Sequence, residues 1–361
     1  MNSLKGKIIN YNESFNGEIF FNNKIEKIHK EEKINENYII LPGFIDLHCH
    51  GGGGFDTMDG YESIKKMSHF HLLKGTTTLL PTTWTSKFDH IKEALYNVNK
   101  LVADLTNNIE GIHLEGPFIN PKKLGAQPAL TQLPSREFIE NIIQTANIKV
   151  ITLAPEIEGM NKFIKFLISK KIRVQFGHTL ADFNTSNEYL RKYPIGFTHL
   201  YNAMSGHTSR ESGVLSSALL NGNFAEIICD KNHVSEEAIK IAHKCIPGLY
   251  AISDAISSTG LDDGIYNFAG AEVQKKNNKV YLKNSNTLAG SAITMHETFK
   301  NLVKMNFSLE EAVRMTSYNA SKYLKLENVG VIEKNNLSNF IVMDKNLNLL
   351  KIFLNGKLVN E

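Results

Sequence analysis

The sequence predicts an α/β fold, a (β/α)₈ TIM-like barrel with a small β-sandwich domain formed by both termini. The central part alternates short apolar segments with amphipathic helical patterns eight times, and this number and the length match such a barrel. A doubly wound open sheet is the alternative, but the chain has neither a GxGxxG turn nor a P-loop to support it. Both ends instead carry short alternating segments of β character.

Length and composition narrow the class of protein. With 361 residues the chain is long enough for one large and one small domain. The net charge is +3 without long basic runs, so we expect neither nucleic acid nor a membrane surface as partner. The chain has only 3 cysteines and no signal-peptide pattern, which favours a reduced, cytoplasmic protein. Cys229 and Cys245 are expected to pack in the core.

The two termini are predicted to build the small domain together. Residues 5–12 and 17–29 alternate between apolar and polar side chains, and so do residues 339–344 and 347–359. Asn355-Gly356 predicts a type I′ hairpin turn. The predicted division is 1–41 and 335–361 for the two parts of the small β-sandwich, and 42–334 for the barrel.

Eight segments are the candidate barrel strands. They span residues 43–48, 76–83, 108–115, 148–155, 172–178, 195–200, 224–229 and 248–254. Helical patterns lie between them, for example at 62–75, 89–105, 135–146 and 235–245.

The first candidate strand ends in His48-Cys49-His50, directly before the run Gly51–Gly54. Successive side chains of a strand point to opposite faces, so His48 and His50 share one face and Cys49 takes the other. Two imidazoles on one face are half of a metal site. For an isolated pair, a hydrogen-bonded core histidine beside a surface histidine is an equally good interpretation.

Polar side chains also follow four later strands. They are Glu115, His178, His199 and Asp254. In a barrel the carboxyl ends of the strands meet at one mouth, so these side chains should converge with His48 and His50. Imidazoles and a carboxylate are good ligands for Zn²⁺ or Fe²⁺, and a bound cation lowers the pKa of water towards about 7. Glu115 is a metal ligand or a bridging group, and Asp254 is the candidate acid and base.

Taken singly, each of these residues has a more ordinary role. Glu115 and Asp254 could cap helices, and His178 and His199 could be hydrogen-bonded core histidines. The metal-site interpretation depends on all of them falling at strand ends together. His113 shares the strand of Glu115, and we expect it to support the ligands rather than to be one.

Read in order, these segments resemble the amidohydrolase superfamily, in its branch of sugar-phosphate deacetylases. The matching segments are PGFIDLHCHGGGGFD, TTTLLPTT, GIHLEGPFINPKKLGA, FGHT, THLYNAMSGHTSRE, SDA and LAGSAITM. The resemblance implies a metal-dependent barrel, a homodimer, and hydrolysis of the acetamide of N-acetyl-D-glucosamine 6-phosphate to D-glucosamine 6-phosphate and acetate. It implies one or two divalent ions per subunit, Zn²⁺ or Fe²⁺, with Glu115, His178 and His199 binding the principal ion and His48 and His50 the second.

The resemblance also implies roles for further positions. Asp254 matches the catalytic aspartate, and Arg210 and His233 match positions that recognise the phosphorylated sugar. The other matched positions are expected to line the substrate site: Ala126, Gln127, Asn202, Ala203, Leu288, Ala289 and Gly290. Two positions depart from the family pattern, because Gln127 stands where a histidine is usual and Lys231 where a small residue is usual.

Two alternative functions remain open at this stage. One is another amidohydrolase that acts on a different N-acyl amino sugar or on a cyclic amide. Glu115 argues against the cyclic-amide enzymes, in which a carboxylated lysine commonly bridges the metals. The other is a non-catalytic protein on a degenerate barrel, which the complete ligand set disfavours.

Overall fold

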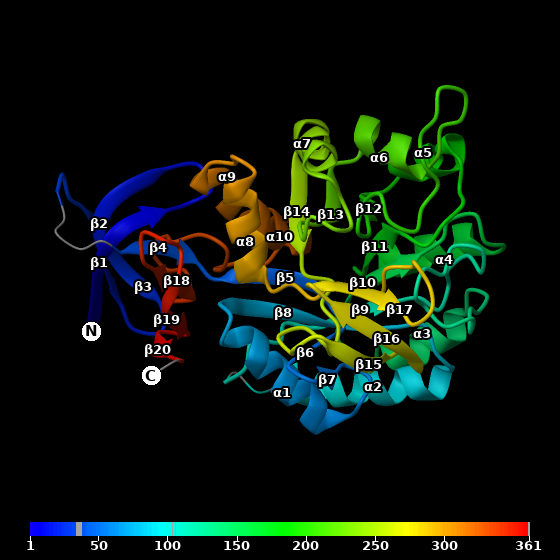
Figure 1. Ribbon diagram of the computed structural model, residues 1–361, viewed down its shortest axis with the longest axis horizontal. Helices are drawn as coiled ribbons and strands as arrows, with labels where there is room; N and C mark the ends of the chain where they lie inside the picture. Colours follow the sequence, from blue (N-terminus) through cyan, green and yellow to red (C-terminus); the bar gives the residue numbers. More distant parts are fainter. Residues whose placement is uncertain (34–37, 103, 105, 360–361) are drawn as a thin grey trace.

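The computed structural model places a (β/α)₈ barrel beside a smaller β-sheet that contains both termini (Figure 1). The structure describes residues 1–33, 38–102, 104 and 106–359. The predicted segments 1–41, 89–105 and 335–361 therefore fall partly outside the described residues.

All eight predicted barrel strands are present. They are β5 (Phe44–Cys49), β8 (Thr76–Thr83), β9 (Ile112–Glu115), β10 (Ile148–Leu153), β11 (Arg173–Phe176), β12 (Gly196–Phe197), β13 (Phe224–Ile228) and β14 (Gly248–Ile252). Strands β5, β8, β9, β10, β11 and β12 form one parallel hydrogen-bonded sheet, and β13 pairs in parallel with β14. Backbone hydrogen bonds close the ring, from Leu200 N–H to the Glu226 carbonyl (2.8 Å) and from Asp254 N–H to the His48 carbonyl (2.9 Å).

A helix follows every barrel strand. The eight are α1 (Tyr61–Leu72), α2 (Phe88–Val102), α3 (Arg136–Ile142), α4 (Met160–Ser169), α5 (Phe183–Leu190), α6 (Val214–Asn221), α7 (Glu236–Cys245) and α8 (Met295–Lys304). Their starts are encoded locally: Ser235 caps α7, and Thr294 with Glu297 forms a capping box on α8. The segments α9 (Leu309–Val313), η1 (Arg314–Tyr318) and α10 (Asn319–Leu324) then lead to the C-terminal strands.

The last barrel strand and α8 are separated by a small antiparallel sheet that we did not predict. It consists of β15 (Gly264–Phe268), β16 (Ala271–Lys276) and β17 (Lys279–Leu282). Both turns are tight and left-handed, at Ala269-Gly270 and at Asn277-Asn278. A second short hairpin, β6 (Gly51–Gly52) with β7 (Phe55–Asp56), follows β5.

The terminal strands form one continuous mixed sheet in the order β20-β19-β18-β4-β1-β2-β3. Its members are β1 (Asn2–Ile9), β2 (Ser14–Phe21), β3 (Ile25–Lys30), β4 (Ile39–Pro42), β18 (Phe340–Met343), β19 (Leu349–Leu354) and β20 (Lys357–Leu358). The sheet curls, since Phe21 on β2 contacts the rings of Phe340 and Phe353. A small β domain built from both termini is thus confirmed, and the hairpin turn Asn355-Gly356 has the two positive φ angles of type I′. The exact domain boundaries stay a prediction.

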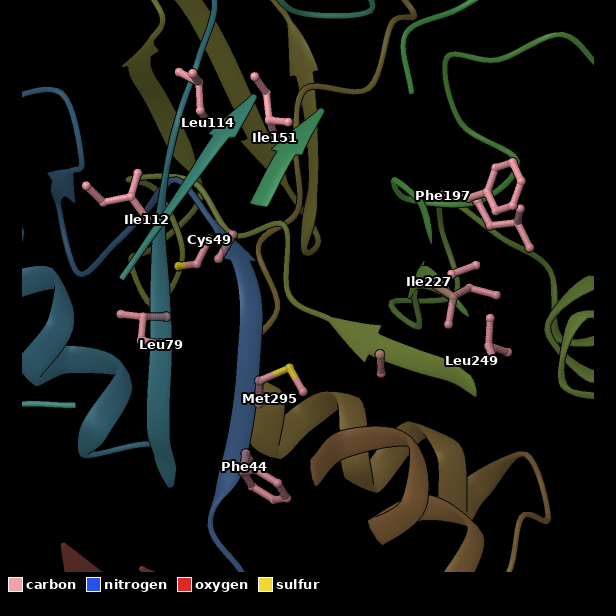
Figure 2. Close-up of a cluster of buried hydrophobic side chains, with 14 of the residues drawn as sticks. Phe44, Cys49, Leu79, Ile112, Leu114, Ile151, Phe197, Ile227, Leu249 and Met295 are labelled. Atoms are coloured by element: carbon pink, nitrogen blue, oxygen red, sulfur yellow. The ribbon is translucent and has the colours of Figure 1, made fainter. Parts of the chain in front are cut away.

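The main hydrophobic core lies between the barrel strands and their helices (Figure 2). Phe44 of β5 packs against Phe299 of α8, and Cys49, Leu79 and Ile112 are fully buried. Inside the barrel a separate cluster includes Ile45, Leu80, Val150 and Ile252. This filled interior supports the barrel mouth, where the polar side chains gather.

Two further points concern the sequence predictions. Cys229 is buried as expected, but Cys245 is exposed at the end of α7, so that prediction was wrong. Within the described residues every helix is too short or too polar to traverse a bilayer.

Candidate active site and metal centre

The predicted ligands converge at the carboxyl ends of the barrel strands. There they border a cavity of about 360 Å³, whose lining includes His50, Glu115, His178, His199 and Asp254. His48 lies deeper and is fully buried. The prediction that polar residues at the strand ends converge therefore holds for these six side chains, His48 included.

The backbone at three of these residues is left-handed. The φ angles are 48° at His178, 27° at His199 and 49° at Asp254. Each residue follows the last hydrogen-bonded residues of its strand, where the chain turns away and the side chain points into the mouth. Such conformations cost roughly 1–3 kcal/mol each for residues other than glycine, and they concentrate at functional sites.

The predicted ligands form two groups of donor atoms. In the first cluster (Glu115, His178 and His199), Oε1 of Glu115 lies 3.1 Å from Nε2 of His178 and 3.0 Å from Nε2 of His199. The two Nε2 atoms are 3.1 Å apart. All three side chains are buried.

In the second cluster (His48, His50 and Asp254), the two histidine Nε2 atoms are 3.2 Å apart. Oδ1 of Asp254 lies 3.4 Å from Nε2 of His48 and 3.3 Å from Nε2 of His50. The second oxygen of Glu115 faces this cluster, 3.2 Å from Nε2 of His50. Glu115 thus directs one oxygen at each cluster.

Both clusters fit a divalent cation. Ligand atoms about 2.0 Å from a tetrahedral ion lie about 3.3 Å from one another, which is close to the observed separations. Hydrogen bonds also orient two of the rings so that, in the neutral form, the proton is on Nδ1 and Nε2 is bare: Nδ1 of His178 donates to the Lys123 carbonyl (2.8 Å), and Nδ1 of His50 to the Thr82 carbonyl (3.1 Å). Bare Nε2 atoms facing one another repel unless a cation lies between them.

Charge–charge interactions in this site are strong. Burial raises the pKa of Asp254, but the nearby rings of His48 and His50 lower it to about 2. Burial lowers the pKa of His50, but Asp254 and Glu115 raise it to about 9. Without a cation, protons on these rings would balance the carboxylates, so cation binding must displace protons.

The structure places behind the ligands an acidic residue that we did not identify from the sequence. Glu226 on β13 is fully buried inside the barrel, and its Oε2 accepts a hydrogen bond from Nδ1 of His48 at 2.9 Å. The signal was present, because Glu226 is the one charged residue in the apolar segment FAEIIC. His113 also lies behind the ligands, donating from one ring nitrogen to the Leu47 carbonyl and contacting Thr152 with the other.

Most of the predicted substrate-site residues line the cavity. These are Ala126, Gln127, Asn202, Ala203, His233, Leu288 and Gly290. Ala289 lies between two of them but is fully buried. Arg210 is exposed on the loop before α6 and is not part of the described cavity lining.

Five lining residues were missed by the sequence analysis. They are Lys122, Lys123, Gly125, Phe268 and Thr287. Phe268 belongs to the unpredicted sheet β15–β17, and its ring contacts that of His50. The lysines bring positive charge to the rim, where His233 donates from Nδ1 to Asp230 at 2.8 Å.

The side chain of Gln127 connects Glu115 to the backbone of Thr85. Its Nε2 donates to Oε2 of Glu115, and its Oε1 accepts the Thr85 N–H at 2.6 Å. Since both amide ends are engaged, the orientation of the side chain is fixed. A glutamine here holds Glu115 in place but carries no ionisable proton.

Comparison with known proteins agrees with this geometry. Residues 39–359 match the Amidohydrolase family. The chain belongs to this family. It is 37% identical over 312 residues to the N-acetylglucosamine-6-phosphate deacetylase of Bacillus subtilis (strain 168), covering 83% of this chain and 78% of the relative.

Other members of the amidohydrolase family extend the comparison. The crystal structure of N-acetylglucosamine-6-phosphate deacetylase from Thermotoga maritima superposes with a TM-score of 0.93 at 29% identity, covering 99% of each chain. The N-acetylgalactosamine-6-phosphate deacetylase of Escherichia coli O157:H7 is 29% identical, over 89% of this chain and 88% of the relative. The protein is therefore a hydrolase of the amidohydrolase family with buried candidate metal sites.

Proposed function

We propose that this amidohydrolase removes the acetyl group from N-acetyl-D-glucosamine 6-phosphate, giving D-glucosamine 6-phosphate and acetate. The observation that carries the proposal is the pair of donor clusters that share Glu115 and open, with Asp254, onto one cavity. The named deacetylases among its relatives support the choice of substrate.

The first cluster would hold the principal divalent ion, Zn²⁺ or Fe²⁺, and the second cluster a further one, with Glu115 shared between them. A cation held there polarises the amide carbonyl and lowers the pKa of a water molecule. Gln127 would keep the Glu115 carboxylate oriented through its hydrogen bond. The buried setting of the ligands strengthens these interactions, because little water screens them.

Asp254 is the proposed general base and acid. With a pKa of about 2 it is ionised at neutral pH and can accept a proton from the attacking water. It would then deliver that proton to the amide nitrogen as the C–N bond breaks, because an unprotonated amine is a poor leaving group. Its Oδ1 already lies beside the ligand atoms of His48 and His50.

The phosphate group requires positive charge at the rim of the cavity. His233 supplies it when protonated, since Asp230 raises its pKa against the effect of burial. Arg210 is exposed and is not among the residues that line the described cavity of its own chain. We therefore propose a homodimer in which the Arg210 loop of one protomer contributes to the phosphate site of its partner.

The test combines acetate release with metal analysis of the purified protein. We expect at least one bound divalent ion per chain and much faster acetate release from the 6-phosphate than from N-acetylglucosamine. Equal rates with the two sugars would contradict the substrate assignment. Full activity after removal of all metal would contradict the mechanism.

A second candidate substrate is N-acetyl-D-galactosamine 6-phosphate, which differs at the 4-hydroxyl group. The relative in Escherichia coli O157:H7 that is named for this sugar favours testing it. The same acetate-release assay with both epimers decides which sugar phosphate is preferred, and we expect the glucosamine form to have the higher kcat/KM.

A further inference from the structure

Glu226 lies on the opposite side of His48 from the cavity. It is fully buried, and its Oε2 lies 2.9 Å from Nδ1 of His48 and 3.3 Å from the backbone nitrogen of His199. One carboxylate oxygen therefore contacts a ligand of each cluster. Yet Glu226 does not line the cavity, so it cannot contact a substrate there.

The contact with His48 selects one form of the imidazole ring. An ionised carboxylate only accepts hydrogen bonds, so the proton of a neutral His48 must be on Nδ1. Nε2 then presents its lone pair towards His50 and Asp254, which is the form that binds a metal ion. The rings of His50 and His178 are oriented by backbone carbonyls. Nδ1 of His199 has no hydrogen-bond partner among the described residues.

Glu226 is itself held by a buried hydrogen-bond network. Its Oε1 accepts from the Tyr250 hydroxyl (3.4 Å), which in turn accepts from Nε2 of Gln175 (2.7 Å). Oε1 of Gln175 accepts from the Thr198 hydroxyl at 2.8 Å. Burying a carboxylate away from water costs free energy, and hydrogen bonds to both oxygens offset part of that cost. A charged group kept in the barrel interior at such a cost indicates a functional role.

We propose that Glu226 is the positioning residue of the second cluster, fixing the His48 ring so that this cluster can hold a second divalent ion. The inference rests on the proposed function, because it assigns a role within the same metal site. Glu226 acts through His48 and does not touch the reacting atoms. Its loss should weaken the second ion more than the first.

The experiment compares three variants of the full-length protein. Glu226→Met removes the hydrogen-bond acceptor, Glu226→Gln keeps an acceptor but removes the charge, and Tyr250→Phe is a control in the same network that leaves the His48 contact intact. Metal per chain is measured by mass spectrometry, and the affinity for a second Zn²⁺ by calorimetric titration. Circular dichroism checks that each variant is folded.

We expect second-ion affinity to fall roughly 100-fold in Glu226→Met and roughly tenfold in Glu226→Gln, while Tyr250→Phe stays close to wild type. If Glu226→Met does not fold, the contrast between Glu226→Gln and Tyr250→Phe decides. Equal losses in Glu226→Gln and Tyr250→Phe, or wild-type affinity in both Glu226 variants, would overturn the inference.

The metal content of the wild-type protein separates this inference from the proposed function. A wild-type protein that binds only one ion and deacetylates the phosphorylated sugar would overturn the role of Glu226 alone. A wild-type protein that binds no divalent ion would overturn both.

Discussion

The two donor clusters share Glu115, but the fold holds them in different ways. His178 and His199 follow separate strands on left-handed backbone, so the turn of the chain fixes their direction. His48 lies near the end of β5 and His50 directly follows that strand, and the ring of His48 depends on the buried side chain of Glu226. The first cluster is thus set by backbone geometry, whereas in the second cluster the ring of His48 depends on a side-chain hydrogen bond, which makes the second cluster easier to remove on its own.

The largest expected effect comes from breaking the first cluster. His178→Gln should abolish binding of the principal ion and lower kcat/KM by roughly 10⁴-fold or more, because the Lewis acid is worth several kcal/mol. His50→Gln is the matched variant in the second cluster, and it should remove one ion while leaving measurable turnover. Metal content and steady-state kinetics of both variants check this, and equal losses would show that the clusters are not separable.

Substitution of Asp254 tests whether a residue of the second cluster also transfers the proton. Asp254→Asn should lower kcat on the order of 10²–10⁴-fold, since the amide accepts no proton from water at neutral pH. The principal ion should stay bound, because the first cluster is intact. An Asp254→Asn variant with unchanged kcat would remove the acid and base role from this residue.

The sequence predicted that these side chains converge, because barrel geometry leaves few choices. Once eight strands were recognised, a polar residue at the end of a strand could only face the mouth, and Glu115, His178, His199 and Asp254 follow this rule. The period of two placed His48 and His50 together and turned Cys49 to the opposite face, where its sulfur contacts His71.

The residues that were missed depend on contacts between distant segments. The charge of Glu226 in an apolar strand was visible in the sequence, but its partner was not, because His48 is 178 positions away and only ring closure brings the two strands together. The sheet β15–β17 was overlooked because its strands are short and half-exposed, which weakens the alternating pattern. Cys245 is the last residue of α7, where exposure depends on how that helix packs.

Acidity should affect the second cluster in a predictable direction. In the cation-free protein burial lowers the pKa of His50, but Asp254 and Glu115 raise it to about 9, so a second ion must displace a proton below that pH. Its affinity should therefore increase with pH up to about 9, by as much as roughly tenfold per pH unit for each proton displaced. Titrations between pH 6 and 9 check this, and a pH-independent affinity would contradict the charge balance described for this cluster.

The smallest expected effect lies at the cavity rim and should leave both clusters unchanged. His233 has a raised pKa, because Asp230 and Asp254 outweigh the effect of burial. Its positive charge therefore persists above the usual pH and is lost as pH rises through the raised value, which weakens phosphate binding. Asp230→Asn should lower that pKa, so KM for the phosphorylated sugar should begin to rise at a lower pH and increase roughly three- to tenfold near neutrality. The KM of unphosphorylated N-acetylglucosamine and the metal content are the controls; if either changes in parallel, Asp230 acts on the fold or on the clusters rather than on the charge of His233.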